Sequence, residues 1–226
     1  MRELARELVG KGLMFDRSSD GCRVVAASTD VLAWPGLFER VLGEVSEYRR
    51  RKALGFSFER DQRLSLLAGL LLDELLVDFG LRERSMTIRE NEFGKPSFSN
   101  RPDLLFSLSH SGNMAVAALA THLVGVDVED LATFSYDIAE PFKWTTMESV
   151  GKALGVGVGA YVDSGEFSIP DDFEVEHVLL DGVAGAAVSE VPGLPGQRDS
   201  EKSNLGDTVN GRYLVCIAQR LPKQLQ

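Results

Sequence analysis

Three short apolar runs follow one another closely in the middle of the chain. They occupy residues 104–109, 114–120 and 124–129. The links between them contain only four and three residues. Parallel neighbours need a crossover of about a dozen residues or more, so links this short join antiparallel strands. The sequence therefore predicts a three-stranded antiparallel meander.

The third of these runs carries two carboxylates. Asp127 and Glu129 alternate with valines, so a strand places both on one face, about two residues' rise apart. This spacing lets two oxygen ligands close on one hard cation, and magnesium suits such a pair. A half-buried strand with its polar face in water explains the same pattern. Because the middle strand of a meander reverses the chain, we expect His110 and Ser111, which follow the first run, to lie near both carboxylates.

Helical and extended patterns alternate in the rest of the chain. Helices are predicted at residues 35–53, 61–79 and 141–154. Further strands are predicted at residues 24–27, 173–180, 186–191 and 213–218. The leucines of the second helix cover more than one of its faces, which indicates a mostly buried element. The polar stretch 192–211 is predicted to be a loop.

Composition narrows the functional classes. A chain of 226 residues, 44% hydrophobic and 26% charged, is typical of one large globular domain or of two small lobes that share a core. The formal charge of −10 argues against nucleic-acid binding, because phosphate backbones are held chiefly by Lys and Arg. No stretch approaches the roughly 18 unbroken apolar residues of a membrane span, and the N-terminus lacks the apolar run of a signal peptide. We therefore expect a cytoplasmic protein that binds neither nucleic acid nor membrane.

Two further sequence features can be explained by a structural role alone. Residues 49–52 place four cations together, which suits either an anionic partner or a solvated helix end. Cys22 and Cys216, the only two cysteines, lie far apart in apolar runs, so they are expected to be buried thiols without a disulfide or a zinc site.

One face of the helix predicted at residues 141–154 carries chemistry-bearing side chains. Trp144, Glu148 and Lys152 follow at four-residue steps and therefore share this face. Glu148 and Lys152 could form only a structural ion pair, and Thr145 with Glu148 also matches a capping box at a helix start. A serine-hydrolase site at Ser109 is disfavoured, because its nucleophile elbow needs a glycine two residues before the serine, where this chain has serine.

Four segments of the sequence resemble, in order, the motif series of surfactin-type phosphopantetheinyl transferases. They are GKP at 94–96, FSLSHSG at 106–112, GVDVE at 125–129 and WTTMESVGK at 144–152. The resemblance covers roughly residues 45 to 160. It implies an α+β fold of two similar, pseudo-dimeric lobes with antiparallel sheets and packed helices, in residues 1–112 and 113–226, with the active site between them. It also implies a monomer.

The resemblance implies a magnesium ion and coenzyme A. The metal ligands would be Asp127, Glu129 and Glu148. Coenzyme A phosphates would be contacted by Lys95, Ser109 and His110, and its 3′-phosphate or the carrier protein by Arg49, Arg50 and Lys52. Lys152 would neutralise charge at the breaking pyrophosphate, and Glu148, or a water that it holds, would take a proton from the acceptor serine.

The implied activity is that of a holo-acyl-carrier-protein synthase. It moves the 4′-phosphopantetheine arm of coenzyme A to a serine of an apo acyl or peptidyl carrier protein of fatty-acid, polyketide or non-ribosomal peptide synthesis. The chain departs from the family at Met147, where a lysine is common, and in the short segment 130–143. These departures motivate an alternative, a non-catalytic descendant that binds coenzyme A or a carrier protein. An acyl transferase that binds coenzyme A without a metal is a third hypothesis, which leaves the carboxylates without a task.

Overall fold

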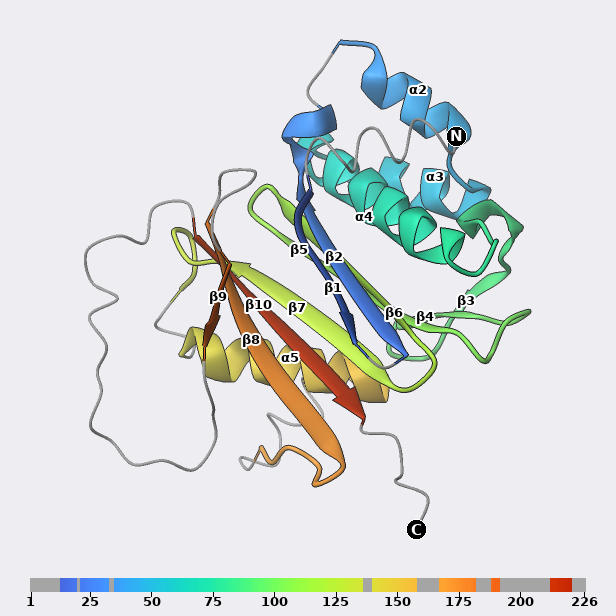
Figure 1. Cartoon of the computed structure of the whole chain (residues 1–226). Helices are drawn as coiled ribbons and strands as arrows, with labels where there is room; N and C mark the ends of the chain where they lie inside the picture. The colour runs from blue at the N-terminus through green and yellow to red at the C-terminus, as the bar shows by residue number, and fades with distance from the viewer. Residues whose placement is uncertain are drawn as a thin grey trace.

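Two antiparallel sheets pack against each other in the computed structural model of the chain (Figure 1). The structure describes residues 13–19, 21–32, 35–135, 140–157, 167–181, 188–191 and 212–220. Within these ranges the first sheet has the order β1 (Leu13–Ser19), β2 (Cys22–Ser28), β6 (Met114–Ala120), β5 (Leu105–Ser111). The second has the order β7 (Val124–Asp130), β10 (Arg212–Arg220), β8 (Phe173–Asp181), β9 (Val188–Val191). A small hairpin pairs β3 (Ile88–Glu90) with β4 (Pro96–Phe98).

Helices cover the outer faces of the two sheets. The described helices are α2 (Leu37–Glu44), α3 (Glu47–Leu54), α4 (Glu59–Val77) and α5 (Pro141–Leu154), with short 3-10 turns η1 (Thr29–Leu32) and η2 (Glu83–Ser85). α4 lies across the first sheet, and α5 lies along the second (Figure 1). The chain is therefore α+β with antiparallel sheets and packed helices, as the resemblance implies.

The alternation of β6 explains how these layers hold together. Ala115 and Ala117 point into the cluster formed with the leucines of α4, whereas Met114 and Val116 point into the cluster formed with the second sheet. Successive side chains of a strand face opposite sides, so a strand covered on both sides is apolar throughout. The two sheets consequently share one core.

The third strand of the predicted meander does not pair with the second strand, as the short links between the strands had predicted it would. β5 and β6 pair antiparallel as predicted, but β6 pairs on its other side with β2. β6 therefore has no free edge left for β7, which pairs with β10 in the second sheet. The meander prediction is wrong for β7, because link lengths do not report which distant strand takes the second edge of β6.

The predicted helices agree with the structure except for one. The helix predicted at residues 141–154 has the same bounds as α5, and the one at 61–79 corresponds to α4. The helix predicted at 35–53 is two helices, because Val45 is extended and the Ser46 side chain accepts a 3.0 Å hydrogen bond from the backbone of Arg49 at the start of α3.

The other expectations divide between confirmed and untested. Both cysteines are free and buried, as predicted. The predicted loop at 192–211 lies outside the described residues. The proposed division into lobes at residues 112 and 113 stays a prediction, and the strand pairing itself changes sheets between β6 and β7. None of the described helices has the length and apolar composition needed to cross a membrane.

Candidate functional site

α5 and β7 approach each other closely at a glycine. A Cβ atom on Gly125 would overlap the carbonyl oxygen of Ser149 and would lie 2.5 Å from the backbone nitrogen of Ala153. Only a residue without a side chain allows this approach of helix and strand. It brings the polar face of α5 to the carboxylates of β7.

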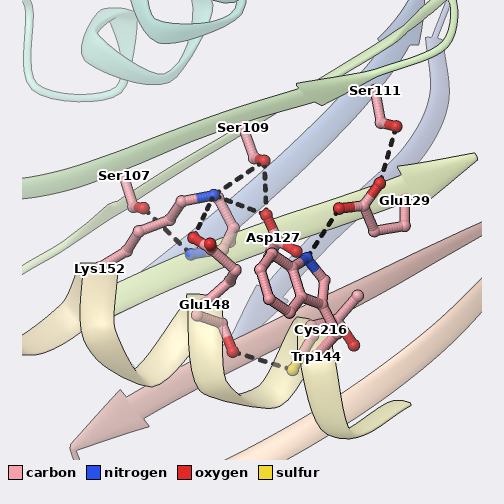
Figure 2. Close-up of polar contacts among 12 residues, drawn as sticks. Ser107, Ser109, Ser111, Asp127, Glu129, Trp144, Glu148, Lys152 and Cys216 are labelled. Carbon is pink, nitrogen blue, oxygen red and sulfur yellow. Dashed lines mark hydrogen bonds and ion pairs between the residues drawn. The ribbon is translucent and has the colours of Figure 1, made fainter. Parts of the chain in front are cut away.

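Lys152 joins the two elements (Figure 2). Its Nζ atom lies 2.6 Å from Oδ1 of Asp127 and 3.7 Å from Oε2 of Glu148, and it donates a 3.0 Å hydrogen bond to Oγ of Ser109. Asp127 is only 3% exposed, so its charge requires such a partner. The shared helix face predicted from the sequence thus points at Asp127.

Glu148 lies in the middle of α5 and not at its start. The helix begins at Pro141, and the Thr145 hydroxyl donates a 2.9 Å hydrogen bond to the Pro141 carbonyl. The capping-box explanation for Glu148 is therefore wrong. A side chain in mid-helix, near a lysine and a buried aspartate, is free of any capping task.

Glu129 is held from two sides. The Ser111 hydroxyl donates to its Oε2 at 2.9 Å, and the Trp144 indole donates to its Oε1 at 3.0 Å (Figure 2). The contact between Ser111 and Glu129 confirms the proximity predicted for the ends of these two strands. Trp144 belongs to α5, so it ties the end of β7 to the helix.

The carboxylates sit in an environment that disfavours their negative charge. Burial raises the pKa of Glu129, and the neighbouring Asp127 charge raises it further. Burial also raises the pKa of Glu148, Lys152 lowers it in part, and Asp127 raises it. Burial is the largest cause of both pKa shifts, and the like charge of Asp127 adds to it.

The oxygen atoms of Asp127, Glu129 and Glu148 are of the type that a hard cation prefers. Their positions among the described residues do not form a metal site. Oδ2 of Asp127 is buried and accepts no hydrogen bond from the residues that the structure describes. An acceptor of this kind, beside two glutamates whose charge is costly, suits an ion that prefers oxygen ligands. However, no three His, Cys, Asp or Glu side chains of the described ranges are gathered closely enough to hold a metal ion, and Lys152 occupies Oδ1 of Asp127.

A pocket of about 360 Å³ opens beside these contacts. It lies between α3, the turn joining β3 to β4, the strand β5 and the C-terminal half of α5. Its charged and titratable lining comprises Tyr48, Arg49, Lys52, Lys95, His110, Glu148 and Lys152. Phe56 and Phe93 add aromatic surface. Cations combined with aromatic rings suit an anionic ligand that carries a flat ring.

Lys95 is positioned by the end of α5. Its Nζ donates a 2.9 Å hydrogen bond to the carbonyl of Ala153, and Asn91 of the same turn donates to the carbonyl of Gly155. Burial lowers the pKa of Lys95 to about 8. His110 lies on another wall of the pocket, and its pKa is lowered by burial and by the Lys152 charge.

The structure places the basic segment in three different settings. Arg49 is 3% exposed and forms a buried ion pair with Glu83 at 2.8 Å, although it also borders the pocket. Arg50 donates hydrogen bonds to the carbonyls of Leu42 and Gly43 at the end of α2. Lys52 lines the pocket and pairs with Glu90 at 2.9 Å. These contacts do not test whether any of the three binds coenzyme A.

Two positions behave differently from what the motifs alone suggested. Met147, which stands where the family commonly has lysine, is 8% exposed and is not part of the pocket wall. Ser107 was not singled out from the sequence, yet its hydroxyl accepts a 3.1 Å hydrogen bond from the backbone of Val126. The recurrence of serine at every second residue of β5 was the available signal.

Several known proteins are similar to this chain. A 4′-phosphopantetheinyl transferase of Bacillus subtilis is 27% identical over 168 residues, which cover 64% of this chain and 75% of that protein. The 4′-phosphopantetheinyl transferase Sfp of Bacillus subtilis strain 168 is 25% identical over 167 residues, which cover 63% and 75%. The 4′-phosphopantetheinyl transferase gsp of Aneurinibacillus migulanus is 27% identical over 152 residues, which cover 57% and 63%.

No family model matches the chain. The resemblance predicted from the motifs is nevertheless confirmed: the chain is similar, over about 60% of its length, to Sfp-type 4′-phosphopantetheinyl transferases of Bacillus and related species.

Proposed function

We propose that this protein transfers the 4′-phosphopantetheine arm of coenzyme A to a serine of an apo acyl or peptidyl carrier protein and releases 3′,5′-adenosine bisphosphate. One observation carries the proposal: Asp127, Glu148 and Lys152 meet at the wall of a pocket lined by cations. The names of the similar proteins support the same general reaction.

The pocket offers separate groups for the parts of coenzyme A. Lys52 of α3 and Lys95 of the turn between β3 and β4 both line it, and both carry donors suited to phosphate oxygens. His110 adds a third polar group on β5. Arg49 is held in a buried ion pair with Glu83 and Arg50 does not line the pocket, whereas the ion pair of Lys52 with Glu90 is exposed, so we assign both arginines a smaller share in binding than Lys52.

Glu148 is the group that we propose as proton acceptor. Burial raises its pKa above the usual value, which makes it a stronger base than an exposed glutamate while it is ionised. It takes the proton of the carrier serine as the serine oxygen forms a bond to phosphorus and the pyrophosphate bond breaks. The electron pair of that bond leaves on the 3′,5′-adenosine bisphosphate, and Lys152 stabilises the charge that develops there.

Asp127, Glu129 and Glu148 are the residues that we propose to hold Mg²⁺. When bound, Mg²⁺ would offset the negative charge of the pyrophosphate oxygens. Asp127 would offer Oδ2, which accepts no hydrogen bond from the described residues, and Ser111 with Trp144 keeps Glu129 oriented. Lys152 can exchange Asp127 for phosphate oxygens, because its side chain is 30% exposed and its ammonium group can move on a flexible stem.

The finer assignments belong to the same proposal. Two similar lobes, a monomeric state and a carrier of fatty-acid, polyketide or non-ribosomal peptide synthesis follow the resemblance. A non-catalytic descendant is not favoured, because the similar proteins are named as transferases and the departure at Met147 lies outside the pocket wall.

An intact-mass assay tests the proposal. The protein is incubated with coenzyme A, Mg²⁺ and a small panel of apo carrier proteins, and one carrier should gain a single phosphopantetheine arm. EDTA should abolish the gain, and added Mg²⁺ or Mn²⁺ should restore it. Glu148→Gln should lower transfer by about a hundredfold or more, the scale on which positioned acid–base groups act, while the melting temperature changes little.

A matched control uses another helical glutamate. Glu59 on α4 forms an ion pair with Arg63 four residues later, as Glu148 does with Lys152, but it does not border the pocket. Glu59→Gln should therefore leave transfer unchanged. Transfer that survives chelation would contradict the metal, and a folded Glu148→Gln variant with normal transfer would contradict the role of Glu148.

A further inference from the structure

The two sheets meet along a seam between β5 and β7. β5 is the last strand of the first sheet, and β7 is the first strand of the second, so among the described strands each has one edge without a paired neighbour. The two strands nevertheless contact each other along their length (Figure 2). An edge strand presents backbone N–H groups that must find partners when they are buried.

Serine hydroxyls supply these partners. Ser107 Oγ accepts a 3.1 Å hydrogen bond from the backbone of Val126, and Ser111 Oγ accepts a 3.1 Å hydrogen bond from the backbone of Asp130. The two serines lie four residues apart on β5, and the two amides lie four residues apart on β7. The serines therefore fix β7 in one register against β5, in the place of a backbone ladder.

Ser111, together with Ser109 between the two seam serines, also reaches the carboxylates of the site. The Ser111 hydroxyl accepts a hydrogen bond from the backbone of Asp130 and donates one to Oε2 of Glu129. Because it acts as acceptor and donor at once, its orientation is fixed. Ser109, between the two, donates to Oδ1 of Asp127 at 2.8 Å. The three serines recur at every second residue and so share one face of β5.

We propose that Ser107 and Ser111 are positioning residues, which hold β7 by its backbone so that Asp127 and Glu129 keep their places beside α5. Neither serine needs to touch the substrate for this role. The inference concerns the seam itself, and it rests on the proposed function only where it predicts an effect on metal binding.

Amide hydrogen exchange, followed by NMR on the intact protein, tests the seam without any assay of activity. In the wild type, the amides of Val126 and Asp130 should be protected. Ser107→Ala should increase exchange at Val126 by about tenfold or more and leave Asp130 protected for the most part, and Ser111→Ala should do the reverse. Ser111→Thr keeps the hydroxyl and should restore protection of Asp130.

The matched control is Ser28→Ala. Ser28 is buried, as Ser107 is, and its hydroxyl also accepts a backbone hydrogen bond, from Asp30, but it lies on β2, two strands away from β5. This change should leave exchange at Val126 and Asp130 unaltered. Unprotected amides at both positions in the wild type would overturn the proposal, even if an alanine variant does not fold.

Binding of Mn²⁺ to the protein alone, measured by electron paramagnetic resonance, tests the consequence for the carboxylates. Ser111→Ala should weaken Mn²⁺ binding by about tenfold or more, the scale found when a residue that orients a metal ligand is removed, and Ser111→Thr should recover most of it. Unchanged exchange and unchanged Mn²⁺ affinity in Ser111→Ala would overturn the inference. A wild type that binds Mn²⁺ but transfers nothing would contradict the proposed function and leave the seam intact.

Discussion

Lys95 illustrates how the surroundings of a single side chain set its chemistry. A lysine usually keeps its proton to a pH well above 10, but burial at the end of α5 lowers the pKa of Lys95 to about 8. A phosphate placed beside Nζ favours the charged form and therefore raises this pKa in the complex. Binding of a phosphate ligand then takes up a proton.

The affinity for coenzyme A should consequently depend on pH. Because Lys95 of the free protein loses its charge as the pH rises through about 8, the affinity should fall by about tenfold between pH 7 and pH 9. Isothermal titration calorimetry in buffers of different ionisation enthalpy measures both the affinity and the proton uptake. Lys95→Arg keeps its charge over this range, so its affinity should be nearly independent of pH. Equal pH dependence in both proteins would show that Lys95 does not meet the ligand.

At the scale of elements, the packing of α5 on β7 rests on Gly125. Gly125→Ala places a methyl group against the backbone of Ser149 and Ala153, which no side-chain rotation can relieve. We expect the free energy of unfolding to fall by about 1–3 kcal/mol, the usual cost of overpacking, and transfer to fall as Lys152 moves away from Asp127. Chemical denaturation and the intact-mass assay measure these two effects.

Gly43→Ala is the matched control for this substitution. Gly43 lies in α2, and a Cβ atom there meets no heavy atom within 4 Å. Alanine is a better helix former than glycine, so this variant should be as stable as the wild type or more stable. If Gly125→Ala behaved like Gly43→Ala, the close approach of α5 and β7 would be wrong.

At the scale of the whole molecule, the two sheets share apolar side chains and should unfold together. Val116 of the first sheet and Val126 of the second belong to one buried cluster. In a Trp34→Phe background, fluorescence of Trp144 reports on α5, and far-UV circular dichroism reports on the whole chain. The two probes should give coincident transitions in urea, and Val116→Ala should shift both midpoints downward together. Two separate transitions would mean that the sheets form independent cores.

The sequence alone was sufficient for features that depend on neighbours along the chain. It predicted α5 with its correct bounds, the antiparallel pairing of β5 with β6, the free buried cysteines and the shared helix face of Glu148 and Lys152. It also supplied the resemblance that the comparisons confirm. These features follow from helical and strand periodicity, from link length and from motif order, which are local properties of the chain.

Only the tertiary structure decided which segments distant in sequence lie together. β2 takes the edge of β6 that a meander would give to β7, and Arg49 is engaged by Glu83, 34 residues later in the chain. The bonds of Ser107 and Ser111 to β7 likewise depend on where the two sheets meet. The physical reason is competition: an edge, a buried charge or an unpaired amide is satisfied by whichever partner the whole fold brings near, and periodicity along the chain does not identify that partner.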